Sequence, residues 1–417
     1  MDRLLEVFLK SIVRFGAVTI QTASGHEFDI GDGSGKPIKL VFRDRAAQAR
    51  LIRDPALTLG EIYMDGQLDI EGGDVLDLHM AAQRNITSAD MSAVLRLADR
   101  MRFLARGWKQ NNVERRSRSN VAHHYDLDGR LYELFLDPDM QYSCAYYEAP
   151  DQTLEEAQIA KKRHIAAKLC IEPGHTVLDI GCGWGGMGLY LAQVCGAKVT
   201  GVTLSTEQLA VANKRALAAS LRDRAEFRLQ DYRHVEERFD RVVSVGMLEH
   251  VGANFLEQYF RRVASVLSEG GVALIHTIGR TDGPGVTNPW IAKYIFPGGY
   301  IPALSELTAA IEQAGLYLTD LEVLRLHYAD TLRDWRNRFM ARRDEAKALY
   351  DERFCRMWEF YLAGSEASFR IGQNVVFQLQ LARRIDAVPV TRDYIARQEA
   401  DLRQREPDQA AYKMAGE

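Results

Sequence analysis

The sequence has few cysteines and lacks a long apolar run. Its 417 residues include five cysteines, which form no CxxC pair and no cluster with metal-ligand spacing. This odd, scattered set indicates reduced thiols rather than a disulfide framework or a zinc site, and no metal is expected. No stretch approaches about 18 uninterrupted apolar residues, so no segment is expected to span a bilayer. The N-terminal residues mix charged and apolar types and do not resemble a secretory signal.

An excess of charge of one sign is also missing. The 53 basic and 57 acidic residues leave a net charge of −4, so no global field attracts nucleic acid. No basic groove-like stretch accompanies the motifs described below, which disfavours nucleic-acid methylation. Hydrophobic residues make up 47% and charged residues 26%, a composition that excludes wholesale disorder. A chain of this length exceeds the usual limit of one core, about 250–300 residues, and two domains are expected.

Strand and helix patterns alternate between residues 153 and 277. Strands are expected at 176–180, 198–203, 226–229, 239–245 and 271–277, with helices at 153–169, 186–195, 206–217 and 255–267. This alternation predicts an α/β fold, a doubly wound, mostly parallel sheet with helices on both faces. The expected domains are a small α+β unit over 1–105, a basic linker over 106–122, the α/β domain with helical insertions over 123–390, and a charged tail over 391–417.

Less regular patterns flank this region. In the small unit, helices are expected at 1–20 and 44–54, and strands at 17–21 and 38–42. Beyond residue 325 the sequence becomes helical and basic over 332–362 and then apolar over 375–381. These segments are expected to complete the two domains without forming an internal repeat.

A glycine-rich turn follows the first expected strand of the α/β domain. It reads Asp179-Ile180-Gly181-Cys182-Gly183-Trp184-Gly185-Gly186, and Gly181 and Gly183 allow a tight turn and the close approach of a ligand. A dinucleotide loop, GxGxxG, is matched by Gly181, Gly183 and Gly186, and a loop that only turns the chain is a further alternative. Asp179, two residues before the first glycine, instead resembles the S-adenosylmethionine loop of class I methyltransferases, where it would help to fix the amino-acid end of the ligand.

The ends of the next two strands bear on the same choice. Thr203-Leu204-Ser205 lacks the acid that usually holds ribose hydroxyls, and the hydroxyl groups with Gln208 would supply those hydrogen bonds instead. Ser205 could also only cap the following helix, and both roles can hold together. After the third strand, Gln230-Asp231-Tyr232 places an acceptor where the adenine amino group is expected, although an Asp that opens a loop can be purely structural.

Several longer motifs occur in order along the chain. They are residues 140–146 (MQYSCAY), 177–186 (VLDIGCGWGG), 203–205 (TLS), 246–252 (GMLEHVG) and 276–279 (HTIG), with 124–127 (HYDL), 289–291 (PWI) and 293–297 (KYIFP). Together they resemble the cyclopropane-fatty-acyl-phospholipid synthases and the related mycolic acid cyclopropane synthases and methyltransferases. The likeness covers about residues 120–385. Across 1–105 it is thinner and rests on 60–66 (GEIYMDG), which is similar to that family's small lipid-facing domain.

The resemblance implies an enzyme that adds the methyl group of S-adenosylmethionine to a cis double bond of a phospholipid acyl chain. Proton loss from the resulting carbocation then closes a cyclopropane ring. The implied base is a bicarbonate or carbonate ion held by Cys144, Glu249, His276, the Ile278 backbone and Tyr328. The resemblance also implies cofactor contacts from Tyr142, Ser143, Trp184, Gly185 and Gly246. From the residues alone, Cys144 could be a small core residue and His276 a satisfied strand histidine.

The carbocation adds two requirements. The site must exclude water, which would trap the cation as an alcohol, and aromatic faces can stabilise it. The aromatic candidates, for most of which ordinary core packing is the alternative, are Tyr142, Tyr146, Tyr147, Trp290, Tyr294 and Phe296.

One position departs from the family. Where relatives often carry a cysteine just before Phe-Arg, residues 364–370 (GSEASFR) place Ser365. Serine without a nearby base is a poor nucleophile, but the implied mechanism forms no covalent enzyme adduct, so Ser365 should be tolerated. Two other functions stay open. One is methylation of the same double bond without ring closure, giving methyl-branched or methyl-unsaturated chains, and the other is non-catalytic lipid binding.

The implied substrate lies in a membrane. Without an anchor, the protein is expected to be cytoplasmic and to attach peripherally to the inner face of the membrane. Candidate elements are the first helix, with Leu4, Leu5, Phe8, Leu9, Ile12 and Val13 on one side, the basic stretch 96–118, and 333–347, where Trp335, Phe339 and Met340 mix with arginines. The alternatives are a homodimer face for the first helix and solvated faces for the others. The expected partners are a phospholipid surface and unsaturated acyl chains, with no nucleic acid.

Overall fold

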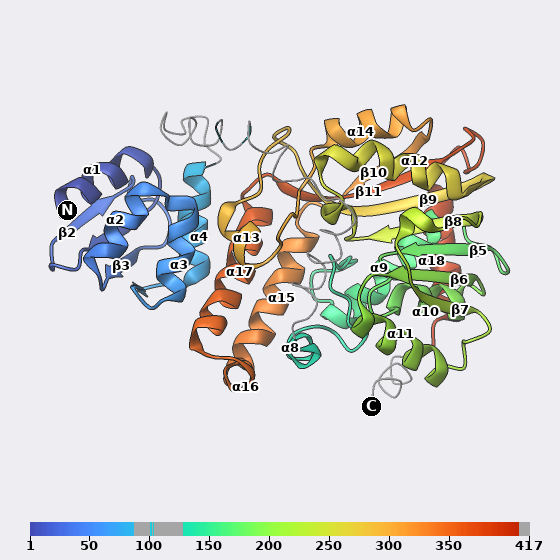
Figure 1. Ribbon diagram of the computed structural model, residues 1–417, viewed down its shortest axis with the longest axis horizontal. Coiled ribbons are helices and arrows are strands. Elements are labelled where there is room, and N and C mark those ends of the chain that lie inside the picture. Colours follow the sequence, from blue (N-terminus) through green and yellow to red (C-terminus); the bar gives the residue numbers. More distant parts are fainter. Residues whose placement is uncertain (87–100, 102, 104–127, 408–417) are drawn as a thin grey trace. The chain divides into compact units, whose positions relative to one another are not determined.

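The computed structural model describes residues 1–86, 101, 103 and 128–407 (Figure 1). The expected linker over 106–122 and the HYDL motif at 124–127 lie outside the described residues, as does nearly all of the basic stretch 96–118. The chain forms two compact units. The first contains the described residues of 1–109 together with 286–297 and 329–374, and the second contains those of 110–285, 298–328 and 375–417.

The first unit begins with a small α+β fold. Its helices are α1 (Asp2–Ile12), α2 (Arg45–Arg53), α3 (Pro55–Met64) and α4 (Val75–Ile86), and its strands are β1 (Val18–Gln21), β2 (Glu27–Ile30), β3 (Ile38–Phe42) and β4 (Leu68–Glu71). The sheet order is β2-β1-β3-β4, with β1 and β3 parallel. The helix expected over 1–20 is shorter than predicted, because the chain turns at Gly16, whose φ of +116° favours glycine, and then enters β1.

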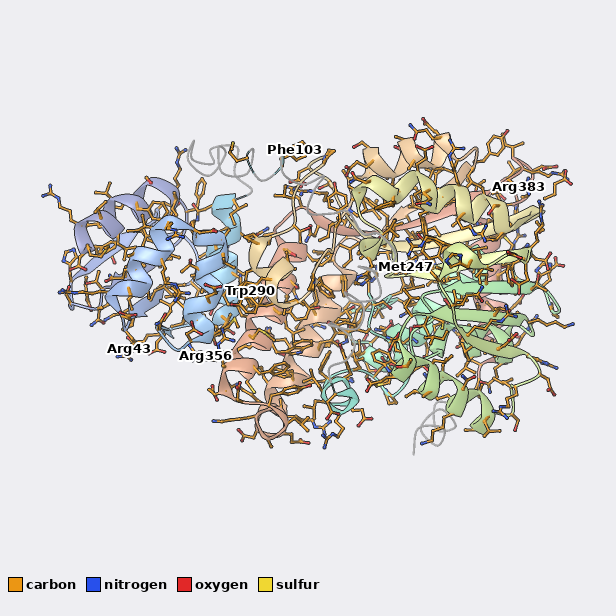
Figure 2. All side chains as sticks on the ribbon, in the orientation of Figure 1. Arg43, Phe103, Met247, Trp290, Arg356 and Arg383 are labelled. Atoms are coloured by element: carbon orange, nitrogen blue, oxygen red, sulfur yellow. The ribbon has the colours of Figure 1, made fainter. Side chains whose placement is uncertain are left out.

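Later segments complete the first unit. They are α13 (Pro289–Tyr294), the part of α15 (His327–Ala341) from Ala329 onward, α16 (Arg343–Leu349) and α17 (Glu352–Arg370). Helix α17 packs against α3 and α4, and Arg356 donates to the backbone oxygens of Tyr63 at 2.5 Å and Leu68 at 2.9 Å (Figure 2). Trp290 of α13 is buried, with its Nε1 3.2 Å from the Met64 Sδ. The basic helical segment 332–362 therefore folds together with the N-terminal residues.

The second unit is the α/β domain that the sequence predicts. Its strands are β5 (Thr176–Ile180), β6 (Lys198–Thr203), β7 (Ala225–Leu229), β8 (Phe239–Val245), β9 (Leu267–Arg280), β10 (Tyr317–Val323) and β11 (Asn374–Ala382). They lie in the order β10-β11-β9-β8-β5-β6-β7, parallel from β9 to β7, with β10 antiparallel to β11. The doubly wound, mostly parallel sheet is confirmed. Its chain order reverses between β5 and β8, the place where such sheets bind ligands.

Helices cover both faces of this sheet (Figure 1). They are α9 (Leu154–Lys168), α10 (Gly186–Val194), α11 (Thr206–Ala218), α12 (Leu256–Val266), α14 (Leu304–Gln313) and α18 (Asp393–Arg405). The short helix α8 (Gly129–Glu133) precedes them, and 3-10 turns lie at Tyr232–His234, Leu248–His250 and Ala253–Phe255. One core joins α9, α10 and α18 to one face of the sheet, and a second joins α12 and α14 to the other. The expected charged tail thus includes a packed helix, α18, whose Tyr394, Ile395 and Leu402 are buried.

Candidate active site

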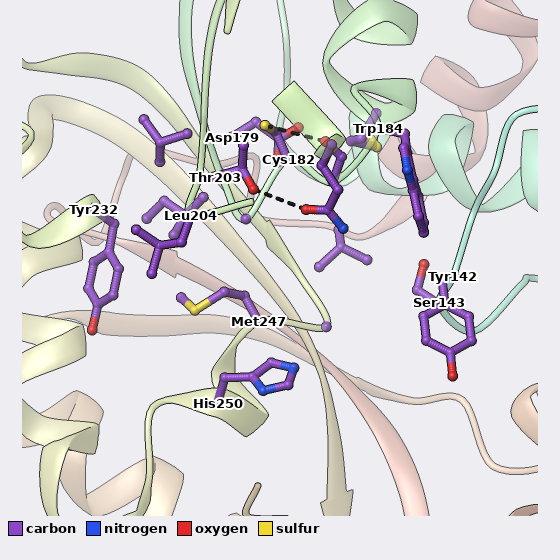
Figure 3. A pocket seen from close by; sticks show the side chains of 18 of the residues that line it. Tyr142, Ser143, Asp179, Cys182, Trp184, Thr203, Leu204, Tyr232, Met247 and His250 are labelled. Carbon is purple, nitrogen blue, oxygen red and sulfur yellow. Dashed lines mark hydrogen bonds between the residues drawn. The ribbon is translucent and has the colours of Figure 1, made fainter. Parts of the chain in front are cut away.

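A pocket lies at the carboxyl ends of the parallel strands, where the strand order reverses (Figure 3). Most of the predicted cofactor-binding residues line it: Tyr142, Ser143, Asp179, Gly181, Gly183, Trp184, Gly186, Thr203, Leu204, Gln208, Gln230, Asp231, Tyr232 and Gly246. Two predicted residues are not among its lining residues. Gly185 is the N-cap residue of α10 and has a φ of +84°, and Ser205 caps α11 by accepting the Gln208 N–H at 3.3 Å. The capping role considered for Ser205 is therefore present.

The loop after β5 leaves space in the pocket. Gly181 and Gly183 have φ values of +79° and +53°, a left-handed conformation that residues with a Cβ rarely adopt. A Cβ on Gly183 would meet no described atom within 4 Å, and this glycine lines the pocket. A Cβ on Gly181 would approach the Met247 Cγ to 2.8 Å. The glycines thus allow a ligand to approach the loop backbone.

Asp179 ends β5 as a buried carboxyl group. It is 1% exposed, and its Oδ2 has no hydrogen-bond partner within the described chain. Burial raises the pKa of Asp179 to about 7, although a hydrogen bond from the Gly188 backbone opposes this shift. A buried polar atom without a partner costs about 1–3 kcal/mol. Asp179 is therefore suited to receive a donor from a ligand, such as the α-amino group of S-adenosylmethionine.

Polar side chains at the end of β6 are arranged around one amide group. Thr203 Oγ1 donates to Gln208 Oε1 at 3.0 Å and accepts the Ser205 N–H at 3.1 Å. Because the Gln208 oxygen is occupied, the amide nitrogen is the end available to a ligand in the pocket. This arrangement fits the prediction that Gln208 and the neighbouring hydroxyls replace an acid as partners for ribose hydroxyls.

Two acceptors follow β7. Burial alone would raise the pKa of Asp231, but hydrogen bonds from Arg233, at 2.9 Å and 2.6 Å, hold that pKa below its ordinary value. Asp231 is therefore an anion and an acceptor at neutral pH. Gln230 donates its amide nitrogen to the His234 carbonyl at 2.9 Å, which leaves its own oxygen as a second acceptor. Either group can receive an adenine amino group.

Glu249, predicted to be catalytic, lies in the turn Leu248–His250, and the Ile278 backbone holds its carboxyl group. Its Oε1 accepts the Ile278 N–H at 2.5 Å. In the described structure its Oε2 is buried without a partner, and burial raises the pKa of Glu249 to about 7. The resemblance assigns the Ile278 backbone to a bound anion, and in this structure the Ile278 N–H donates to Glu249.

His276 lies two residues before Ile278 in β9 and is 2% exposed. Its Nδ1 is 3.3 Å from the Gln378 Nε2. With this amide as donor to Nδ1, the neutral ring carries its proton on Nε2, which has no partner among the residues described. Burial lowers the pKa of His276 well below its usual value, so the ring is neutral at pH 7. Glu249 and His276 thus combine a carboxyl group that titrates near neutral pH with a neutral N–H donor.

The other catalytic candidates belong to different segments of the chain. Cys144 directly follows the pocket residue Ser143, is 1% exposed, and has its Sγ 3.2 Å from the Ala145 carbonyl oxygen. Tyr328 is buried in the first turn of α15, in the second unit, whereas Ser365 is half-buried in α17, in the first unit. The structure therefore joins Glu249 to the Ile278 backbone, two residues from His276 in the same strand, and none of the three is among the residues that line the pocket.

Most of the aromatic candidates pack against other rings. Tyr142 lines the pocket and meets Tyr132 edge-on, with 5.3 Å between ring centroids. Tyr146 is stacked between His164 and His327, at 4.2 Å and 4.8 Å. Tyr147 packs against the ring of His327, Trp290 packs against Tyr294, and Phe296 packs against Tyr361. Of these candidates, Tyr142 is the one that faces the cofactor pocket.

Sequence reasoning missed the buried cations of α9. Lys161-Lys162-Arg163-His164 and Lys168 have the composition of a solvated helix face, yet all of them are buried. A signal was available, because charged and apolar residues of α9 are not segregated to opposite faces, as they are in a half-exposed helix. Met247 and His250, which also line the pocket, were missed as contacts although they lie inside a recognised motif.

The sheet order, the glycine-rich loop after β5 and the pocket beside it define a class I S-adenosylmethionine-dependent methyltransferase. A family model described as mycolic acid cyclopropane synthetase matches residues 112–379, and the model of a domain of unknown function matches residues 4–91. The chain belongs to the mycolic acid cyclopropane synthetase family, which confirms the resemblance found in the sequence motifs.

Relatives are similar over most of the chain. A probable fatty acid methyltransferase of Pseudomonas putida is 36% identical over 363 residues, covering 84% of this chain and 87% of the relative. The cyclopropane-fatty-acyl-phospholipid synthase of Escherichia coli K12 is 37% identical over 341 residues, covering 81% and 86%. The solved structure of mycolic acid cyclopropane synthase CmaA1 complexed with SAH and CTAB is 33% identical, with a TM-score of 0.60, covering 63% of this chain and 97% of that one. The protein is thus an enzyme of the S-adenosylmethionine-dependent lipid methyltransferase and cyclopropane synthase family.

Proposed function

We propose that the protein methylates the cis double bond of unsaturated phospholipid acyl chains and closes a cyclopropane ring. The observation that carries this proposal is the pair Glu249 and His276. Each has one buried atom without a partner in the described structure, and Glu249 directly precedes the pocket residue His250. Ring closure requires the removal of a proton, and these groups are suited to hold or move it. The name of the Escherichia coli relative supports a phospholipid substrate.

The residues that line the pocket also have to position the reactants and exclude water. S-adenosylmethionine supplies the methyl group when bound, and an alkene is a poor nucleophile, so the two must be held in near-attack geometry. Met247, Phe255 and Tyr142 give the pocket an apolar part that excludes water, which would otherwise trap a carbocation. The ring of Tyr142 also offers a face that stabilises positive charge.

Bicarbonate would supply the base for this step when bound. The residues proposed to hold it are Cys144, Glu249, His276, the Ile278 backbone and Tyr328. Two observations fit an anion that carries one hydroxyl group: the His276 Nε2–H is a buried donor, and the Glu249 Oε2 is a buried acceptor, both without partners in the part of the chain described. In this proposal the Ile278 N–H contributes by orienting the carboxyl group of Glu249.

Methylation without ring closure is the second candidate function. The name of the Pseudomonas putida relative favours it. The two reactions share the cofactor, the double bond and the cation, and they differ in which proton is removed. The same residues of this chain therefore serve both, and the product has to be identified chemically.

Expression in a host without such enzymes should add one methylene group to unsaturated acyl chains of its phospholipids. Mass spectrometry of the fatty-acid methyl esters measures the gain, and mild hydrogenation separates the products, because a methyl-unsaturated chain takes up hydrogen and a cyclopropane chain resists it. The Glu249→Gln chain is the matched control. Methyl-branched or hydrogenated products would select the second candidate, and an unchanged lipid profile would contradict both.

For membrane attachment we propose the outer face of α1. Met1, Leu4 and Val7 are 53%, 63% and 63% exposed, next to the exposed Arg3 and to Lys10, which is paired with Glu6. An apolar strip flanked by cations suits an anionic lipid surface. Within the ranges that the structure describes, no helix has the length and apolar character to cross a membrane.

The other predicted lipid-facing residues are used differently. Leu5 and Leu9 of α1 are buried within the first unit. In segment 333–347, Trp335 and Phe339 are buried. Several of its arginines are paired with carboxylates: Arg333 with Asp330, Arg336 with Glu366, Arg342 with Glu345 and Arg343 with Glu352. These contacts favour α1 over segment 333–347 as the attachment element.

Association with anionic phospholipid vesicles should weaken as salt rises, because the Debye length falls from about 10 Å at 0.1 M to about 3 Å at 1 M. The double variant Leu4→Glu, Val7→Glu should bind less at every salt concentration, since apolar insertion is lost. Vesicle sedimentation measures both effects. Ile385→Glu, which changes a 74% exposed residue of the second unit, is the control and should bind as wild type does. Unchanged vesicle binding by the α1 double variant would show that this face of α1 does not attach the protein to the membrane.

A further inference from the structure

Helix α9 carries a row of buried cations, and one of them differs from the others. Lys162 donates to Asp139, Arg163 to Glu148 and Glu406, His164 contacts Glu322 and Glu399, and Lys168 donates to Glu322. Lys161 is 0% exposed, and its Nζ donates to two neutral oxygens, Gln141 Oε1 at 2.7 Å and Ser143 Oγ at 2.8 Å. A buried ammonium group with no carboxylate in contact is costly, and it persists where something else stabilises it.

The charges around Lys161 do not balance. Asp137 and Asp139 face it from the segment before Tyr142. Asp139 is bound by Lys162 and by Arg215 of α11, and Asp137 accepts backbone N–H groups of its own turn. Three basic side chains therefore share two carboxylates, and Lys161 is the one that has no carboxylate of its own in hydrogen-bond contact.

Ser143 connects Lys161 to the cofactor pocket. Its Oγ accepts a hydrogen bond from Lys161, so its hydroxyl hydrogen is left to donate elsewhere. Ser143 lines the pocket, beside Tyr142 and close to Trp184 (Figure 3). A carboxylate bound there would receive a hydrogen bond from Ser143, and the cation behind the serine would strengthen that bond.

Two groups of opposite character thus border one pocket. Asp179 offers a buried carboxyl oxygen without a partner in the described chain, and Ser143 offers a hydroxyl group backed by Lys161. An amino acid carries an ammonium and a carboxylate group on the same carbon, so its two charges complement both sites. S-adenosylmethionine ends in such a group, whereas methylthioadenosine lacks it.

We propose that Lys161 is a positioning residue that acts through Ser143 to hold the carboxylate of the S-adenosylmethionine amino-acid end. The proposal rests on the assignment of this pocket to that cofactor. Its distinguishing consequence is selectivity: Lys161 stabilises ligands that carry the carboxylate and contributes nothing to ligands that lack it.

A proton readout follows from the same contacts. The charged or titratable groups that face Lys161 include Asp137, Asp139, Lys162, Cys144 and His276. Burial lowers the pKa of Lys161 to about 7, so at pH 8 the amine is mostly neutral without ligand. A bound carboxylate favours the charged amine, and binding should therefore take up protons at pH 8. Asp179, with a pKa raised by burial to about 7, is already mostly ionised there, and His276 stays neutral.

Calorimetry at pH 8 with S-adenosylhomocysteine and with methylthioadenosine tests the proposal. Lys161→Met should weaken S-adenosylhomocysteine binding about 10- to 100-fold, the range of a charge-assisted hydrogen bond, and leave methylthioadenosine affinity within about twofold. Proton uptake, measured in buffers of different ionisation enthalpy, should disappear. Ser143→Ala should cause the same selective loss of S-adenosylhomocysteine affinity. The double variant should lose little more affinity than either single variant, because both substitutions break the same contact between Lys161, Ser143 and the ligand carboxylate.

Lys168→Met is the matched control, since Lys168 is equally buried on the same helix but is paired with Glu322. It should lower stability and leave the affinity ratio of the two ligands unchanged. Equal weakening of both ligands by Lys161→Met and Ser143→Ala, or no weakening by either, would overturn the proposal. If the wild-type chain binds neither ligand, the cofactor assignment itself fails and this proposal fails with it, a result distinct from selective loss.

Discussion

The Glu249→Gln variant is expected to lose about 10²–10⁴-fold in turnover, the usual contribution of a group that takes up or delivers a proton, while binding S-adenosylmethionine as wild type does. The substitution keeps the oxygen that accepts the Ile278 N–H, but its amide group cannot accept a proton. The pKa of Glu249, raised by burial to about 7, suits proton transfer at neutral pH. Methyl transfer to unsaturated phospholipid vesicles in degassed buffer measures turnover.

Stability gives this variant a second readout. Folding raises the pKa of Glu249 from 4.5 to about 7, so between these values the folded protein binds more protons than the unfolded chain. The free energy of unfolding therefore falls as pH rises from about 4.5 to about 7, and Glu249→Gln removes that loss. At pH 8 the variant should melt at or above the wild-type temperature. A lower melting temperature with lost cofactor binding would mean that Glu249 is part of the pocket's structure.

Two further variants complete the experiment. Glu306→Gln is the matched control, because the Glu306 carboxylate also accepts a backbone N–H, that of Ala303 at 3.0 Å. Unlike Glu249, it accepts a second hydrogen bond, from the Tyr300 hydroxyl at 2.6 Å. It should keep wild-type turnover. Cys144→Ser retains a small hydrogen-bonding group, and added bicarbonate at fixed pH should partly restore its activity. If wild type, Cys144→Ser and Glu249→Gln are all insensitive to bicarbonate, the ion is not the base.

The Gly183→Val variant is expected to weaken S-adenosylmethionine binding on the order of 100-fold or more, equivalent to about 2.7 kcal/mol. A side chain at this position would project into space bordered by the pocket, where no described atom lies within 4 Å. The φ of +53° also places valine in a strained conformation, which should lower stability. Calorimetry at a temperature where the variant is fully folded measures the affinity.

Gly315→Val separates the two effects. Gly315 has a φ of +70°, and a Cβ there would also meet no described atom within 4 Å, but it is not among the residues that line the pocket. It should lower stability to a similar degree and keep wild-type affinity. Loss of affinity in both variants would show that backbone strain, and not occupation of the pocket, weakens binding. Undiminished binding by Gly183→Val would remove the loop from the cofactor site.

The cofactor residues could be predicted from the sequence because each lies at or just after the end of a strand that the sequence pattern reveals. In a parallel sheet the carboxyl ends of the strands lie at one edge, so Asp179, Thr203 and Asp231 had to come close together once their strands were found. Strand β10 gave a weaker signal and was missed, since its residues are half-buried or exposed and it pairs antiparallel with the distant β11.

The contacts that tune the site could not be predicted in this way. The bond from Ile278 to Glu249 and the bonds from Lys161 to Gln141 and Ser143 join residues that are far apart along the chain. Composition suggests that a run of cations is solvated, and only the packing of α9 within the second unit shows that Lys161 is buried. The buried, unpartnered atom of Glu249 likewise exists only in the folded chain.

The discontinuous make-up of the first unit affects how this protein can be dissected. Cutting the chain after residue 109 would remove Arg356, the donor to the Tyr63 and Leu68 carbonyls. It would also remove the Trp290 indole, which lies so close to Gly60 that a Cβ on Gly60 would clash with it. The N-terminal residues are therefore not an autonomous module that one cut can release. Their removal would expose the surfaces of α13 and α17 that pack against α3 and α4.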